Sequence, residues 1–241
     1  MKTSVFLIIV LVSGFSAGIV HGLVNLVIVE PYLDRAISIE NQSRFASGEI
    51  NDTSEFWQEF SKYRVWQKES SIISNGILGL ATGALFGVVF AYSEKILPGR
   101  HDVQKSLVLG GILWLTLFFI PFLKYPSNPP TVGDPHTIVF RSITYVLFIA
   151  MSGLGALAFA KLYKKIPRKR KFVIPLGYFI YIVIVFFLIP QNPDKITAPT
   201  DLVNGFRMAS LGTMTIYWIV NSLILGFLWK KFRPYSDVTN T

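Results

Sequence analysis

Residues 5–29, VFLIIVLVSGFSAGIVHGLVNLVIV, decide the fold, because they form a long apolar run without Asp, Glu, Lys or Arg. About 20 apolar residues are enough for a helix to cross a hydrocarbon core of about 30 Å, so the run predicts a transmembrane helix. Gly14, Gly18 and Gly22 recur at every fourth position within it. Small residues at this spacing let two helix backbones approach closely in lipid, and we call these three the first glycine face.

The start of this run also resembles a secretory signal peptide. Lys2 precedes an apolar core, and small residues follow at positions 16–18. A retained span is the favoured interpretation, because the apolar run continues to Val29 and is too long for a signal core. A mature N-terminus near residue 18 would instead reduce the number of spans to five.

The composition predicts an all-α integral membrane protein. Hydrophobic residues make up 51% of the 241 residues and charged residues only 15%, against about 25% charged residues in an average soluble domain. The only long polar segment is 30–71, so we expect a single membrane domain over residues 1–241. The predicted fold is a six-helix transmembrane bundle with spans at 5–29, 72–92, 106–123, 138–160, 172–190 and 208–229.

The second span repeats the glycine spacing of the first. Gly79, Gly83 and Gly87 are again four residues apart, and we call them the second glycine face. Two such faces on consecutive spans predict that these helices pack against each other through their glycines.

The polar segment 30–71 becomes aromatic toward its end. Phe56, Phe60 and Tyr63 fall on one helical stripe. Aromatic side chains are typical of the membrane–water interface, so we expect an amphipathic helix on the outer membrane surface.

Seven basic residues lie between the fourth and fifth spans, in the segment 161–171. Such clusters are typical of cytoplasmic loops, so they indicate orientation and not nucleic-acid binding. The predicted protein is therefore a multi-pass protein of the cell membrane, in contact with lipid, with both termini cytoplasmic. The segments 30–71, 124–137 and 190–207 then face outside.

The motif content argues against an enzyme. The chain has no cysteine, which excludes disulfides and thiolate metal sites. It contains no phosphate-binding loop, no HExxH and no GxSxG motif. We therefore expect neither catalytic residues nor a firmly bound cofactor.

His21 and Asn25 are the polar residues to explain in the first span. At 100° per residue they lie on the first glycine face, so they are expected to point into the bundle. Imidazole and amide groups there would suit ligands on a cation path. Alternatively, His21 forms a structural hydrogen bond with Asn75 or Thr82 on the second span.

Residues 124–137, KYPSNPPTVGDPHT, form a loop with four prolines, each of which restricts the backbone. The loop supplies Asp134 and His136 as possible outer metal ligands. Glu30, at the end of the first span, could join them at the mouth of a path.

Two arginines, Arg141 and Arg207, lie near the outer membrane boundary. Isolated positive charge there would oppose cation entry, so each is expected in a structural ion pair. The acids considered as partners are Glu30, Asp34, Asp134 and Asp201.

Three segments together resemble the CbtA family of predicted cobalt transporter subunits. They are EPYLDRAISIE at 30–40, PFLKYPSNPPTVGDP at 121–135 and FRMASLGT at 206–213. The resemblance implies a membrane protein that supplies cobalt together with a small single-span subunit, CbtB, which carries a histidine-rich end. It also implies about five spans, whereas the apolar runs predict six.

The leading hypothesis is accordingly a cobalt, or divalent-cation, transporter subunit of the cytoplasmic membrane, with cobalt as its substrate. The expected path runs from Asp134, His136 and Glu30 past His21 and Asn25. The alternative is a structural or assembly subunit of a larger membrane complex that carries out no transport.

Overall fold

The computed structural model describes residues 3–130 and 132–232, without the side chain of Arg168. This part of the chain is helical and contains no strand. Its elements are α1 (Thr3–Ile28), α2 (Glu30–Ala46), α3 (Ser54–Ser93), α4 (Asp102–Leu113), the π-helical η1 (Trp114–Phe119), α5 (Ile120–Lys124), the 3-10 turn η2 (Pro135–Thr137), α6 (Ile138–Lys165), the 3-10 turn η3 (Arg168–Arg170), α7 (Val173–Leu188) and α8 (Thr200–Phe232).

The contacts divide the chain into two units, and each is described by itself. The first unit consists of Met1–Gly111, Pro129–Thr131 and Thr200–Thr241. The second unit consists of Ile112–Asn128 and Val132–Pro199.

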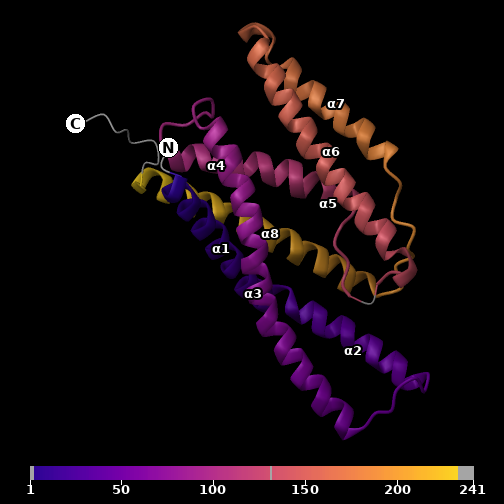
Figure 1. Ribbon diagram of the computed structural model, residues 1–241. Coiled ribbons are helices and arrows are strands. Elements are labelled where there is room, and N and C mark those ends of the chain that lie inside the picture. Colours follow the sequence, from indigo (N-terminus) through magenta and orange to yellow (C-terminus); the bar gives the residue numbers. More distant parts are fainter. Residues whose placement is uncertain (1–2, 131, 233–241) are drawn as a thin grey trace. The chain divides into compact units, whose positions relative to one another are not determined.

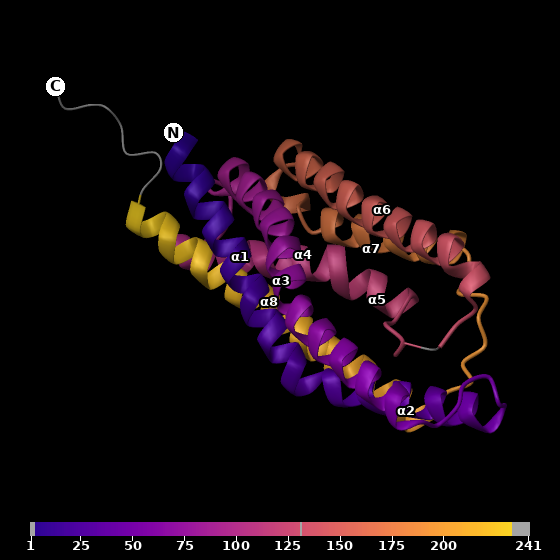
Figure 2. The same ribbon diagram turned by 60° about the horizontal axis from the view of Figure 1, so that its bottom comes forward.

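The core of the first unit is formed by α1, α3 and α8, with α1 packed against both of the others (Figures 1 and 2). Phe86 and Phe90 of α3 are fully buried, as is Leu225 of α8. The Phe90 ring meets the Trp229 ring edge-on, with 5.0 Å between their centroids. Burial of these large side chains fixes how the three helices are rotated about their own axes.

The α3 helix differs from the expected arrangement, because it is continuous over 40 residues, from Ser54 to Ser93. Such a helix is about 60 Å long, roughly twice the thickness of a hydrocarbon core. The expected separate surface helix at the end of segment 30–71 is therefore the first half of the spanning helix itself. The physical reason is that 54–93 contains no proline to break the helix.

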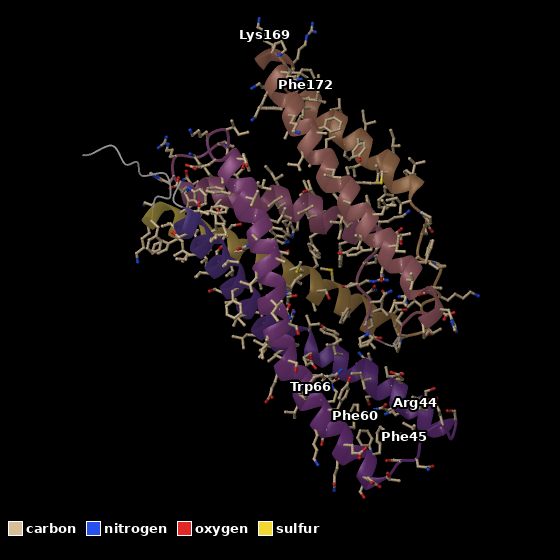
Figure 3. The ribbon with its side chains drawn as sticks, viewed as in Figure 1. Arg44, Phe45, Phe60, Trp66, Lys169 and Phe172 are labelled. Atoms are coloured by element: carbon tan, nitrogen blue, oxygen red, sulfur yellow. The ribbon has the colours of Figure 1, made fainter. Side chains whose placement is uncertain are left out.

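The first half of α3 runs back along α2 in a helical hairpin (Figure 1). Phe45 of α2 contacts Phe56 of α3 with 5.3 Å between ring centroids, and Phe56 stacks on Phe60 at 5.7 Å. Figure 3 labels Phe45 and Phe60 on facing helices of this hairpin. The aromatic side chains expected at the membrane surface thus also hold the hairpin together.

The second unit is built on α6 and α7, which lie side by side and run in opposite directions (Figures 1 and 2). Phe148 of α6 packs with Val185 and Ile189 at its centre. The Tyr178 hydroxyl adds a polar tie, 2.9 Å from the Ser152 hydroxyl.

Five helical segments of the described chain are long and apolar enough to cross a membrane. They are Thr3–Ile28, Ser54–Ser93, Asp102–Lys124, Pro135–Lys165 and Thr200–Phe232. The span expected at 172–190 forms α7, an apolar helix of 16 residues. At 1.5 Å per residue α7 is about 24 Å long, which is short for a hydrocarbon core of about 30 Å.

Candidate functional site

The two glycine faces set the geometry of the site by bringing α1 and α3 into backbone contact. A Cβ atom added at Gly14 would lie 2.1 Å from the carbonyl oxygen of Gly79, and one added at Gly83 would lie 2.5 Å from Cα of Gly14. At Gly18 an added Cβ would lie 2.2 Å from the carbonyl oxygen of Asn75. No side chain fits at these positions, so the contact fixes the register of α1 against α3.

The two ends of this contact differ in how closely the helices approach. A Cβ added at Gly22 would lie 2.9 Å from Cα of Ile72, whereas one added at Gly87 would meet the Val10 side chain at 1.9 Å. All six glycines of the two faces therefore lie at the α1–α3 contact.

This register places His21 of α1 beside Asn75 of α3. Nδ1 of His21 lies 2.8 Å from Oδ1 of Asn75. The Asn75 amide is held in this orientation because its Nδ2 donates to the carbonyl oxygen of Ser71 at 2.8 Å. Oδ1 of Asn75 can only accept, so Nδ1 of His21 carries the proton and donates. In the neutral imidazole, the lone pair is then on Nε2.

Asn25 lies on the Nε2 side of the imidazole, one helical turn along α1. Its Nδ2 is 3.4 Å from Nε2 of His21, a long and weak hydrogen bond. Its Oδ1 is buried and has no hydrogen-bond partner among the described residues. The His21–Asn25 pair therefore offers an imidazole nitrogen and an amide oxygen, neither of them strongly engaged.

Polar groups of α8 continue from this pair inside the first unit. The Tyr217 ring lies edge-on to the His21 ring, with 5.6 Å between centroids. The Tyr217 hydroxyl is hydrogen-bonded to the Thr82 hydroxyl. One turn further along α8, Asn221 is fully buried and neither atom of its amide has a hydrogen-bond partner in the described part of the chain. An amide buried without partners is costly, so its presence calls for an explanation.

At the start of α2, Glu30 and Asp34 are neutralised by two basic residues of α3. Arg64 contacts Glu30 through Nη2, and the same atom lies 2.7 Å from Oδ1 of Asp34. Lys68 Nζ lies 2.9 Å from Oδ2 of Asp34. Glu30 is therefore a buried partner of Arg64 and not a free carboxylate.

The charges of this group also set the protonation of Asp34. Partial burial alone would raise its pKa, but hydrogen bonds from Lys68 and Arg64 and their positive charge outweigh that effect. They hold the pKa of Asp34 below its ordinary value of 3.8. Asp34 is thus ionised at neutral pH and paired.

The second unit contains Asp134 and His136, and neither is gathered into a metal site there. Oδ1 of Asp134 accepts the backbone N–H of His136 at 2.8 Å and so caps the turn that starts α6. The His136 side chain is exposed. In the described part of the chain, no three His, Cys, Asp or Glu residues form a group that could hold a metal ion.

Arg141 pairs with Asp194, which is not one of the acids expected as its partner from the sequence. Nε of Arg141 lies 2.9 Å from Oδ2 of Asp194, and Thr137 donates to Oδ1 of Asp194 at 2.7 Å. Gly133 passes close to the pair with φ +114°, and a Cβ there would lie 2.5 Å from Oδ2 of Asp194. Only glycine suits that position, both in space and in conformation.

Other acids considered for the arginines are held by different groups. Asp201 pairs with Arg35 at 2.7 Å, and Asp34 pairs with Arg64 and Lys68. Arg207 is half-buried on α8. The signal for the group at α2 was present in the sequence: Glu30 and Asp34 share the four-residue spacing of Arg64 and Lys68.

A family model described as "Probable cobalt transporter subunit (CbtA)" matches residues 3–230, nearly the whole chain. No curated protein and no solved structure matches.

Proposed function

The chain belongs to the CbtA family of probable cobalt transporter subunits, and from this premise we propose that His21 and Asn25 form the intramembrane part of a cobalt path. The protein is a multi-pass membrane protein by its apolar helices. As a subunit of a transporter, it works with a partner.

The observation that carries the proposal is the hydrogen bond between His21 and Asn75. Histidines that bind metals usually donate their second ring N–H to an oxygen acceptor, which fixes the tautomer and the ring orientation. Asn75 is such an acceptor, 2.8 Å from Nδ1 of His21. The arrangement leaves Nε2 as the donor atom for Co²⁺, a cation that imidazole suits.

Asn25 supplies the second donor of the proposed path. Its Oδ1 is buried and lacks a hydrogen-bond partner in the described chain. The Nδ2 atom of the same side chain contacts Nε2 of His21. A site of two neutral donors is weak, which suits a cation that must leave as well as enter. Tyr217 and Asn221 extend the same polar line along α8.

Glu30 of the first unit, and Asp134 and His136 of the second unit, are kept as proposed outer ligands, each within its own unit. Glu30 is paired with Arg64, so a cation at the mouth competes with a guanidinium for this carboxylate. Asp134 keeps one carboxylate oxygen beyond its cap, and His136 is exposed. A potential of 100 mV supplies about 2.3 kcal/mol per charge, so inward movement of a divalent cation requires no ATP in principle.

The proposal includes the membrane arrangement and the partner. We place both termini in the cytoplasm of a cell whose cytoplasmic membrane holds the protein, because the basic segment 161–171 favours that side. The partner is a small single-span subunit of the CbtB type. Cobalt is the transported substrate and not a resident cofactor.

Cobalt uptake into proteoliposomes made with this chain and its partner tests the function. Variants H21A and H21Q are compared with H101A, which removes an exposed histidine from the loop between α3 and α4. We expect both His21 variants to lose uptake at least about tenfold and H101A to keep it. Uptake by folded H21A and H21Q equal to that of the wild type would exclude His21 from the path.

The alternative, a structural subunit without transport, draws on the exposed aromatic side chains of the α2–α3 hairpin. Tyr63 and Trp66 stack at 5.9 Å between centroids and are more than half exposed. Stable co-purification with a large enzyme in mild detergent, without cobalt binding or uptake, would favour this alternative.

A further inference from the structure

The tip between α6 and α7 carries the densest positive charge of the chain. Seven of the residues from Lys161 to Lys171 are Lys or Arg, and no Asp or Glu occurs between positions 135 and 193. Figure 3 labels Lys169 and Phe172 at this tip, beyond the helices. The six basic residues whose side chains are described are Lys161, Lys164, Lys165, Lys169, Arg170 and Lys171.

Five basic residues in other parts of the described chain are paired with carboxylates. Ion pairs are formed between Arg35 and Asp201, Arg44 and Glu49, Arg64 and Glu30, Lys68 and Asp34, and Arg141 and Asp194. In contrast, none of the described side chains of the basic tip forms an ion pair. The acids of the second unit, Asp134 and Asp194, lie at the other end of α6 and α7. The tip is therefore a concentrated and uncompensated positive charge.

Apolar and aromatic side chains are interleaved with these cations. Leu162, Tyr163 and Phe172 are 46%, 43% and 69% exposed. Nζ of Lys171 lies 4.4 Å from the centroid of the Tyr163 ring, a cation–π contact that stiffens the tip. Exposed rings beside cations fit the boundary between acyl chains and headgroups better than they fit water.

The length of α7 sets the depth of the tip. Its 16 residues span about 24 Å, less than a hydrocarbon core of about 30 Å. A short helix draws its flanking residues toward the membrane. Lys169 to Lys171 lie within a few residues of the start of α7 at Val173, so a membrane-crossing α7 would hold them at the level of the lipid phosphates.

We propose that the basic tip at 161–171 binds the headgroups of anionic phospholipids, with Phe172 and Leu162 anchored in the acyl region. The preference of positive charge for one side of the membrane explains where the tip lies. That preference requires neither aromatic anchors nor so dense a cluster of cations. A site for anionic lipid headgroups uses both. The proposal is independent of cobalt transport and holds for either orientation, because it concerns the tip and the leaflet that surrounds it.

Lipid selectivity of the full chain in vesicles tests the proposal. The protein is reconstituted in phosphatidylcholine, and trace spin-labelled phosphatidylglycerol or phosphatidylcholine with identical acyl chains reports the fraction of motionally restricted lipid. We expect the wild type to favour phosphatidylglycerol at least about twofold, and the preference to fall as salt is raised.

Three double variants make the test local. K164Q/K169Q removes two exposed cations of the tip and leaves five, enough to maintain insertion, whereas K95Q/R100Q removes two exposed cations from the loop after α3. The ratio of restricted phosphatidylglycerol to restricted phosphatidylcholine should fall toward one in K164Q/K169Q. It should keep its wild-type value in K95Q/R100Q and K164R/K169R. An equal loss of lipid preference in K164Q/K169Q and K95Q/R100Q would overturn the proposal, because the net charge of the protein alone would then explain the preference. Equal motionally restricted fractions of the two spin-labelled lipids in the wild type would also overturn the proposal. An acidic segment of a partner protein would then be the expected ligand of the tip.

Discussion

Nδ1 of His21 lies 2.8 Å from the side-chain oxygen of Asn75, so a residue of α3 fixes the tautomer of the histidine on α1. The same asparagine is anchored to its own helix by its bond to Ser71. The close backbone contact of the glycine faces makes this possible, because a side chain as short as asparagine reaches α1 only where the helices nearly touch.

Replacement of Asn75 should weaken cobalt binding without removing a ligand. N75L takes away the acceptor and leaves His21 free to turn, so we expect cobalt affinity to fall about 10- to 100-fold. N75D keeps an acceptor for His21 but loses the donor to Ser71, so it should recover part of the affinity. The measurement is titration of purified protein with Co²⁺, followed by the visible absorption bands of the ion. Equal affinity in N75L and the wild type would show that Asn75 does not position His21.

Substitution of Gly83 should destabilise the first unit. In G83A the new Cβ would lie 2.5 Å from Cα of Gly14, so α1 and α3 must separate, at a cost of about 1–3 kcal/mol. G212A is the matched control, because an added Cβ there meets nothing within 4 Å. Its higher helix propensity should leave stability unchanged or raise it by up to about 1 kcal/mol. Thermal melting in detergent measures both, and similar melting temperatures for the two variants would contradict close helix packing.

Replacement of Asn221 should raise the stability of the protein and lower cobalt uptake. N221L replaces a fully buried amide without partners by an apolar side chain of similar size, so we expect about 1–3 kcal/mol of added stability. If Asn221 lines the cobalt path, uptake should fall in the same variant. S222A is the control, since Ser222 is equally buried but its hydroxyl donates to the carbonyl oxygen of Trp218 at 2.7 Å. A higher melting temperature with unchanged uptake would assign Asn221 no role in transport.

The ion pairs of Asp34 should make stability depend on pH at acidic values. The pKa of Asp34 is lower in the folded protein than its ordinary value of 3.8, so its contribution to stability is fully present above that value. It is lost as pH falls through the folded pKa, when the carboxyl group is protonated. Melting temperatures of the wild type and D34N should therefore differ above about pH 4 and converge below it. A difference that grows on acidification would contradict this sign.

Helical periodicity made much of the first unit predictable. The four-residue glycine spacing placed both glycine faces, and the position of His21 on the first of them indicated an inward side chain, which the structure buries. These inferences concern which residues share one face of a helix, and that grouping depends only on local sequence.

The partners of the polar side chains were harder to predict. Asn75 and Thr82 both remained open as partners of His21, and the structure joins His21 to Asn75 and Tyr217 to Thr82. Arg141 has a carboxylate partner, but the partner is Asp194, which lies 53 positions further along the chain. The aromatic segment before the second span is helical and yet continuous with that span.

The sequence by itself determined the membrane class, the family, the helix faces and the places where backbones can touch. These properties follow from hydropathy and periodicity, which depend on residues that are close together in the sequence. The tertiary structure decided which donors meet which acceptors, since a hydrogen bond requires two helices to agree in register and rotation to within a fraction of an ångström. The register and rotation of two helices depend on residues that are far apart in the chain. Here the backbone contact between Gly14 and Gly79 fixes the register of α1 against α3.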